Sequence, residues 1–371
     1  MQHSRRISAL VIGALIASAG LVQASAAPAS GCRADVVRAA GVVSTGTCAR
    51  SHSFRASSHH RVRNHFVDPT CPLTGLETTK AKMHRAAVAV KVENDPAAYP
   101  LSGLDKADLV VEEPVEGGMT RFVAMFHCND ADMVGPIRSA RDTDPSIIQP
   151  MTSVLAAAGA NQIVAGDLEA AGITMVDETA AGTAMQRVDR PGYAVEHTLY
   201  GNSEGLRAIA VASHQGPPPR GILPFGAVAG RARGAHQITL SFGGADQVQY
   251  QWVNGQYVRS DAGSPLTMTD GEQFGVDNVV VEMRTVYLST DIGDASGVPS
   301  PFFEDVPGHD KAILFRNGRA MIGTWQRRSE SGKTVFRTGG GDVMNLRPGN
   351  TVIEMVPNHD GDVSGSVSYH S

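Results

Sequence analysis

The chain has 371 residues, of which 42% are hydrophobic and 19% charged, and its formal net charge is −5. This acidic balance and an aromatic content of only 5% argue against a nucleic-acid-binding protein, which needs a basic face and stacking rings. Four cysteines are too few for a disulfide scaffold and their spacings match no zinc motif, so we expect no metal site and no cofactor.

Residues 1–26 have the pattern of a secretory signal. Arg5 and Arg6 precede an apolar stretch at 9–22, and Ala24-Ser25-Ala26 offers a small-residue cleavage site. The stretch is shorter than the roughly 20 residues of a membrane-spanning helix, and no later run replaces it. We therefore expect an exported protein of the cell envelope or the extracellular space.

Cys32 leaves two alternatives open for the exported chain. The run Ala29-Ser30-Gly31-Cys32 resembles a bacterial lipobox, in which residues 1–31 are removed and Cys32 carries a lipid. The other alternative is cleavage after Ala26 and a disulfide between Cys32 and Cys48. A single lipid chain would give a modest hold on the membrane, and we expect no other membrane contact.

Residues 27–70 are rich in Ser, Arg, His and Ala with little apolar periodicity, which predicts a basic, flexible tether. Its histidines, His59, His60 and His65, fit solvated linker positions better than metal ligands.

Residues 71–215 show the alternating pattern of an α/β domain around a mixed sheet. Short runs of β-formers at 86–94 and 121–128 predict strands covered on both faces, and 103–113 predicts a brief helix leading into a strand. Further on, 153–160 predicts a strand, 167–173 a short helix, and 202–213 a helix capped by Asn202.

Two cysteines border strands of this domain. In an oxidising compartment Cys71 and Cys128 could form a disulfide, and the alternative is that Cys128 is a reactive nucleophile.

The second half of the chain has a different composition and a different residue pattern. Three prolines at 217–219 open a Pro/Gly-rich connector at 216–235, and 236–357 predicts a mainly antiparallel β domain. Asn254-Gly255 and Asn317-Gly318, each between β-forming runs, predict type I′ hairpins. Residues 358–371 predict a disordered tail. The fold class is therefore α+β, with an α/β domain followed by a β-rich one.

A charged set follows the strands of the first domain. Glu112, Glu113, Glu116 and Arg121 lie near apolar runs, and Arg138 and Arg141 follow Gly135-Pro136. Arginine holds carboxylate or phosphate through a planar fork of donors, so the three arginines fit an anionic ligand. The alternative is a structural network in which each arginine pairs with a glutamate.

Several motifs together resemble the YerB-like lipoproteins, a bacterial envelope family of unknown function. They are CPLTGL (71–76), VGPIRSARDTD (134–144), NVVVE (278–282), FRNGRAMIGTWQR (315–327) and LRPGNTVIEMVP (346–357). The resemblance covers roughly 71–357 and implies an envelope location and a two-domain body, but no activity. The positions that match the family include Glu112, Glu116, Arg121, Arg138, Ser139, Arg141, Arg187, His197 and Tyr200. In the second half they include Tyr257, Arg259 and Asp270. Glu196 and Thr198 depart from its pattern.

The residues support a leading hypothesis and two rivals. The leading one is an envelope protein that binds an anionic cell-wall component or small molecule in a cleft of the first domain, to which Glu116 and His197 also contribute. Its ligand-binding residues are Arg121, Arg138, Ser139, Arg141, Arg187 and Tyr200. A rival is a cell-wall glycan hydrolase or lyase with Glu112 or Glu116 as general acid, assisted by His197. The third is a non-catalytic scaffold. Trp252, Tyr257 and Trp325 suit core positions in hairpins better than sugar stacking.

Overall fold

The computed structural model describes residues 69–227, 230–244, 247–294, 296–303 and 307–371, which belong to one compact unit. The predicted signal at 1–26, the tether up to residue 68, Cys32 and Cys48 lie outside the described residues. Within the described ranges, no helix combines the length and the apolar character needed to cross a bilayer.

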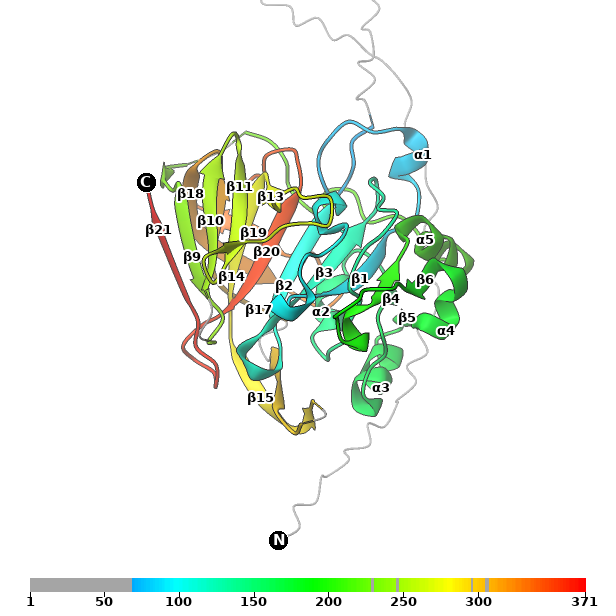
Figure 1. The fold of residues 1–371 in the computed structure, drawn as a ribbon. Helices are drawn as coiled ribbons and strands as arrows, with labels where there is room; N and C mark the ends of the chain where they lie inside the picture. The colour runs from blue at the N-terminus through cyan, green and yellow to red at the C-terminus, as the bar shows by residue number, and fades with distance from the viewer. Residues whose placement is uncertain (1–68, 228–229, 245–246, 295, 304–306) are drawn as a thin grey trace, which may run out of the picture. The chain divides into compact units, whose positions relative to one another are not determined.

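The first half alternates short helices and strands, as predicted (Figure 1). Its strands are β1 (Val88–Glu93), β2 (Leu109–Pro114), β3 (Thr120–Phe126), β4 (Val154–Ala156), β5 (Thr174–Val176), β6 (Met185–Arg187) and β7 (Leu199–Gly201). Its α-helices are α1 (Lys80–Met83), α2 (Asp144–Ile148), α3 (Gln162–Ala170), α4 (Glu178–Ala181) and α5 (Ser203–Ala212). Its 3₁₀ turns are η1 (Pro96–Ala98), η2 (Leu104–Lys106), η3 (Glu116–Gly118), η4 (Gly182–Ala184) and η5 (Val195–His197). Asn202 caps α5 as expected, because its side chain accepts from Gly205 N.

The second half consists of strands. They are β8 (Arg233–Gly234), β9 (Gln237–Ser241), β10 (Gln247–Val253), β11 (Gln256–Asp261), β12 (Ser264–Pro265), β13 (Gly275–Val276) and β14 (Asn278–Arg284). They continue with β15 (Val286–Gly293), β16 (Pro299–Phe303), β17 (Gly308–Arg316), β18 (Arg319–Arg327), β19 (Val335–Thr338), β20 (Thr351–Pro357) and β21 (Ser366–His370). Both predicted hairpins are confirmed: Asn254, Gly255, Asn317 and Gly318 all have positive φ, between 50° and 90°.

One mixed sheet of 11 strands runs through both halves, in the order β19-β18-β17-β14-β20-β2-β3-β1-β4-β5 with β8 beside β18. The halves join where β2 pairs in parallel with β20, from Leu109 opposite Thr351 to Glu112 opposite Glu354. A six-stranded sheet, β12-β11-β10-β9-β21 with β13 beside β11, belongs to the second half alone. The predicted α+β class is therefore confirmed, and a shared sheet connects its two parts.

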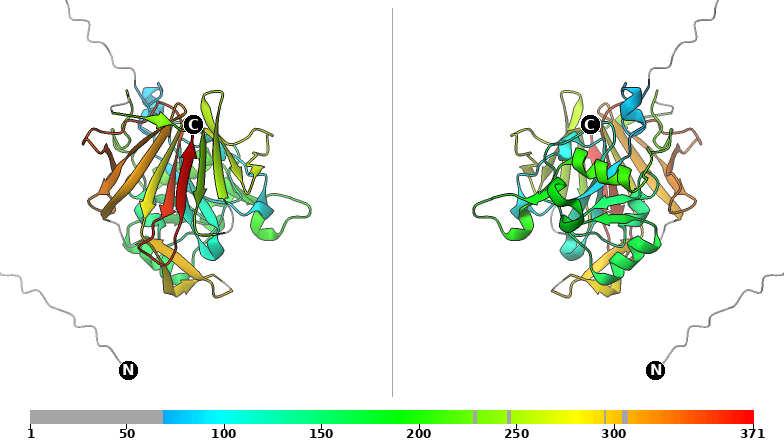
Figure 2. Two further views of the ribbon diagram at one scale, coloured as in Figure 1. Left: turned by 90° about the vertical axis from the view of Figure 1, so that its left-hand side faces the viewer. Right: turned by 90° about the vertical axis from the view of Figure 1, so that its right-hand side faces the viewer.

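Both faces of the large sheet are buried, which explains the apolar runs in its central strands. In β1, Val88, Val90 and Val92 belong to the core cluster that also contains residues of α5 and of the six-stranded sheet. Ala89 belongs to the opposite cluster, with residues of α2 and α3. Two further views, each turned by 90° from the view of Figure 1, show the helices gathered over the first half of the sheet (Figure 2). Tyr257 and Trp325 are fully buried, as expected of core aromatics.

The prediction of a disordered tail at 358–371 is wrong. Ser366–His370 form β21, which pairs antiparallel with β9 from Ser366 opposite Ser241 to His370 opposite Gln237. The segment has little hydrophobic content, but Val367 and Tyr369 alternate with polar residues and pack against the core. The open edge of β9 supplies the backbone partners that the tail needs.

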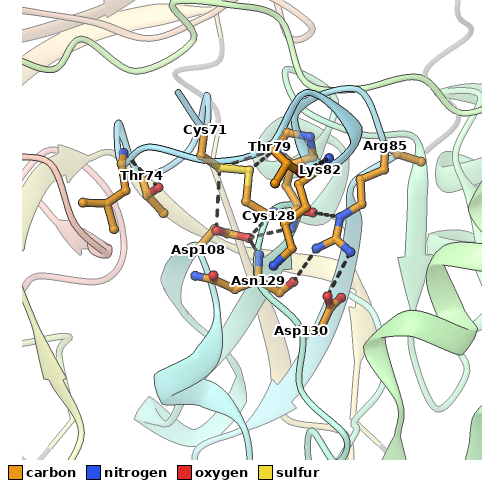
Figure 3. The surroundings of a disulfide bond; sticks show 12 residues. Cys71, Thr74, Thr79, Lys82, Arg85, Asp108, Cys128, Asn129 and Asp130 are labelled. Carbon is orange, nitrogen blue, oxygen red and sulfur yellow. Dashed lines mark hydrogen bonds and ion pairs between the residues drawn. A yellow bond between two sulfur atoms is a disulfide. The ribbon is translucent and has the colours of Figure 1, made fainter. Parts of the chain in front are cut away.

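Cys71 and Cys128 form a disulfide with Cα atoms 6.1 Å apart, so the reactive-nucleophile alternative for Cys128 is wrong (Figure 3). Both cysteines are buried. The Asp108 carboxylate beside them accepts from the backbone N–H groups of His127 (2.6 Å), Cys128 (2.9 Å) and Asn129 (3.1 Å). The bridge and this carboxylate fix the chain where it leaves β3.

Replacing both cysteines by alanine should lower the free energy of unfolding by about 2–4 kcal/mol, because the bridge restricts the unfolded chain over a separation of 57 residues. Urea unfolding of the double variant beside the oxidised wild type measures the loss. A change below about 0.5 kcal/mol would show that the bridge contributes little to stability, against expectation.

Candidate functional site

Three of the predicted arginines line one recess of about 490 Å³. The recess lies where five parts of the chain meet: the β2–β3 turn, the segment before α2, the start of α3, η5 and the β15–β16 hairpin. Its lining consists of Glu116, Met119, Arg121, Arg138, Ser139, Arg141, Asn161, Glu196, Gly293, Asp294 and Ser296. The recess is larger than a site for one water molecule, and its volume suits a small ligand or one end of a longer ligand.

Arg121 is the most unusual of the lining residues. It stands near the start of β3, is 7% exposed, and donates only to Ser139 O, from Nη1 at 2.8 Å. It forms no ion pair with any described residue. Burial, together with the charges of Arg141 and Arg138, lowers the pKa of Arg121 to about 9. The protein therefore holds a cation at a position where its charged form is disfavoured.

Arg138 is only partly neutralised. Its Nε lies 2.9 Å from Glu93 Oε1 as an ion pair without hydrogen-bond alignment, and its Nη groups have no partner among the described residues. Glu93 in turn lies 2.7 Å from His197 Nδ1 through Oε2. Burial raises the pKa of Glu93, although His197 and Arg138 oppose this effect. His197 thus does not line the recess, and it is linked to Arg138 only through Glu93, which contacts both side chains.

Arg141 is fully engaged. It donates to Glu116 Oε2 from Nε (3.0 Å) and Nη2 (2.6 Å), and its Nη1 donates to the carbonyls of Ser139 and Ala140. Ser300 donates to the other oxygen of Glu116. Burial opposes ionisation of Glu116, but Arg141 and the Ser300 hydroxyl hold its pKa below the ordinary value. Glu116 is therefore a carboxylate, which cannot serve as a general acid.

A second buried group supports this side of the recess. Lys91 on β1 pairs with Glu113 and, at 2.7 Å, with Asp144, whose other oxygen accepts from Arg141 N at 2.7 Å. Burial lowers the pKa of Lys91 to about 8, although Asp144 opposes the shift. Glu113 thus belongs to a structural network, and the Asp144 carboxylate fixes the backbone at Arg141.

Neutral donors complete the recess. The Ser139 hydroxyl and the Asn161 amide nitrogen have no hydrogen-bond partner in the part of the chain that the structure describes. Asn161 caps α3, since its side-chain oxygen accepts from Val164 N at 2.9 Å. The backbone N–H groups of Gln162 and Ile163, the first two of that helix, likewise have no partner among the described residues. The sequence prediction missed Asn161 because it placed the start of the helix at 167.

Other predicted site residues lie elsewhere. Glu112 is fully buried and binds Arg259, which donates to it from Nη1 and, at 2.8 Å, from Nη2. Arg187 pairs with Glu178 at 3.1 Å on the surface. Tyr200 is 4% exposed, and its hydroxyl has no partner among the described residues. None of these three lines the recess, so Glu112 has no path to a substrate there.

Comparison with known protein families shows which family this chain belongs to. Residues 73–216 match the model described as "Protein of unknown function (DUF3048) N-terminal domain", and residues 238–353 match the C-terminal domain of the same description. The chain belongs to the DUF3048 family. The two matched segments meet at the β2–β20 pair, so the family's two parts share the large sheet.

Two comparisons relate this DUF3048 protein to the same relative. It is 52% identical over 71 residues to "Putative lipoprotein YerB" of Bacillus subtilis, a match spanning 19% of this chain and 22% of the relative. A crystal structure of YerB from Bacillus subtilis is similar with a TM-score of 0.67 and 25% identity, covering 81% of this chain and 100% of that one. The resemblance to YerB-like proteins is therefore confirmed.

Proposed function

We propose that this DUF3048 protein is an exported envelope protein that binds an anionic, envelope-derived ligand in the recess. The envelope location is supported by the signal-like pattern of residues 1–26 and by the lipoprotein name of its relative. Anion binding is supported chiefly by Arg121, a buried guanidinium without a carboxylate partner beside two further arginines.

The arginine donors of the recess that lack a partner in the described part of the chain favour an anion. Glu116 neutralises Arg141, and Glu93 lies against one edge of Arg138, so Arg121 and the Nη groups of Arg138 are left for a ligand. Buried charges without partners are costly, and a bound anion would lower this cost. Arginine forks also hold carboxylate or phosphate through two donors at once, which adds specificity to the charge.

The glycan hydrolase alternative has little support from the geometry. It needs a protonated carboxyl near the substrate, whereas Glu116 is held ionised by Arg141 and Glu112 lies in the core. His197 is occupied by Glu93. The site is therefore better suited to holding a ligand than to cleaving one.

Arg138→Gln should weaken binding at least tenfold while leaving the melting temperature nearly unchanged. A hydrogen bond to a charged group contributes about 1.5–3 kcal/mol, and Glu93 keeps His197 as its partner in the variant. Isothermal titration at low ionic strength with glycerol 3-phosphate and with N-acetylmuramic acid, one phosphate and one carboxylate probe, measures the effect.

The matched control is Arg337→Gln, which removes the same charge from an exposed position on β19. It should bind both probes as the wild type does. If the wild type binds neither probe, or if both variants bind equally well, the recess is not an anion site.

A further inference from the structure

The segments that line the recess carry exposed apolar side chains. Met119, which lines it, is 44% exposed. Val195 (66%), Ile163 (46%) and Val298 (37%) lie within two residues of the lining residues Glu196, Asn161 and Ser296. These side chains come from four separate segments of the chain, so no single helix or strand pattern explains their exposure. Exposed apolar groups gathered at a binding site commonly contact an apolar part of the ligand.

The donors of the recess favour a phosphate over a carboxylate. Arg121 comes from β3, Arg138 and Ser139 from the segment before α2, and Asn161 from the N-cap of α3. A tetrahedral phosphate can accept from donors on all of these elements, whereas a planar carboxylate offers two oxygens. The start of a helix adds a partial positive charge suited to phosphate, and α3 is nine residues long.

Two exposed carboxylates, Glu196 and Asp294, also line the recess. They would repel a chain that carries a charge at every repeat, such as a polyanionic wall polymer. An isolated anionic head attached to an apolar tail avoids this repulsion, because only its head enters the arginine-lined part.

Combining these features, we propose that the recess receives the terminal phosphate of a lipid phosphomonoester, whose acyl or prenyl chain lies against Met119, Ile163, Val195 and Val298. This inference rests on the proposed anion-binding function and names the class of ligand. The net charge of −5 opposes general attraction to an anionic membrane, so recognition would depend on the recess itself.

The test uses the full chain purified without an attached lipid, and sedimentation with phosphatidylcholine vesicles containing a minor fraction of phosphatidic acid. We expect binding at least tenfold tighter than to pure phosphatidylcholine, and tighter than to vesicles with an equal fraction of phosphatidylglycerol. Arg138→Gln should abolish this preference. Residues 27–70 are the same in both proteins, so any contribution from their positive charges cancels.

A double variant, Met119→Ser with Val195→Ser, separates the lipid tail from the phosphate. It should bind phosphatidic acid vesicles about tenfold more weakly, because it loses apolar burial, while binding glycerol 3-phosphate as the wild type does. The matched control is Val211→Ser with Ile322→Ser, two side chains of 57% and 54% exposure on α5 and β18. This control should bind both as the wild type does.

Three results would overturn the lipid assignment. The first is equal vesicle binding by the Met119→Ser, Val195→Ser variant and by its control. The second is no preference for phosphatidic acid, and the third is tighter binding of soluble poly(glycerol phosphate) than of vesicles. If glycerol 3-phosphate or N-acetylmuramic acid still binds in an Arg138-dependent way, the anion site remains and only the lipid is wrong. If no probe binds, both proposals fail.

Discussion

Arg259→Met should lower the free energy of unfolding by about 3–5 kcal/mol, the largest loss that we expect from a single substitution. Arg259 is fully buried between the two family segments and binds Glu112, also fully buried, with its fork. Its Nε donates to Asp261 at 2.9 Å. Removing the cation leaves these carboxylates buried without compensation. Urea unfolding with a shared m-value measures the change.

A double variant provides the control. Burial and the charge of Glu112 raise the pKa of Glu354 well above its usual value, whereas, against the effect of burial, Arg259 holds the pKa of Glu112 below its usual value. Glu112→Gln combined with Arg259→Met removes both charges and should recover more than half of the loss, as expected of a coupled pair. A loss below about 1 kcal/mol in Arg259→Met would show that this network does not hold the two halves together.

Arg121→Met should have opposite effects on binding and on stability. The variant should lose at least tenfold in anion affinity, because the guanidinium that has no carboxylate partner among the described residues is gone. Its free energy of unfolding should not fall, and should rise by about 1 kcal/mol, because methionine fills the same space without a buried charge. The Ser139 carbonyl keeps a donor in Arg141 Nη1, at 3.3 Å. Urea unfolding of the variant and the wild type measures the stability change. A loss above about 1 kcal/mol would show instead that Arg121 is a structural residue.

Local signals explain what could be predicted from the sequence. The apolar runs of β1 and β3 predicted buried strands because both faces of the sheet are covered. Asn254-Gly255 and Asn317-Gly318 predicted hairpins because these pairs adopt positive φ readily. Arg121, Arg138 and Arg141 could be grouped from the sequence because Arg121 lies near the start of β3 and the other two lie in the segment that follows this strand.

Pairings between distant segments could not be predicted. Nothing local to β2 or β20 indicates that they pair. The Arg259–Glu112 contact likewise joins residues 147 positions apart, on β11 and β2. The β15–β16 hairpin contributes Gly293, Asp294 and Ser296 to the recess without any charge pattern that would mark them. The tail strand β21 has too few apolar residues to be predicted alone, since the edge of β9 decides its structure.

The arginines of the recess differ in which of the two alternatives they fit, a ligand site or a structural network. Arg141 is held by Glu116, as the structural alternative proposed, whereas Arg121 has no carboxylate partner among the described residues. These two arginines face the same recess. Their different pairing could not be predicted, because it depends on how η3 places Glu116.

Calorimetric titration of the wild type and of Arg121→Met with glycerol 3-phosphate and N-acetylmuramic acid tests the central claim most directly. We predict saturable binding of at least one of these anions by the wild type, with a single site per chain, and affinity at least tenfold weaker in a variant that is no less stable. Equal affinities in the two proteins, or no binding by the wild type, would contradict the assignment of the recess as an anion site.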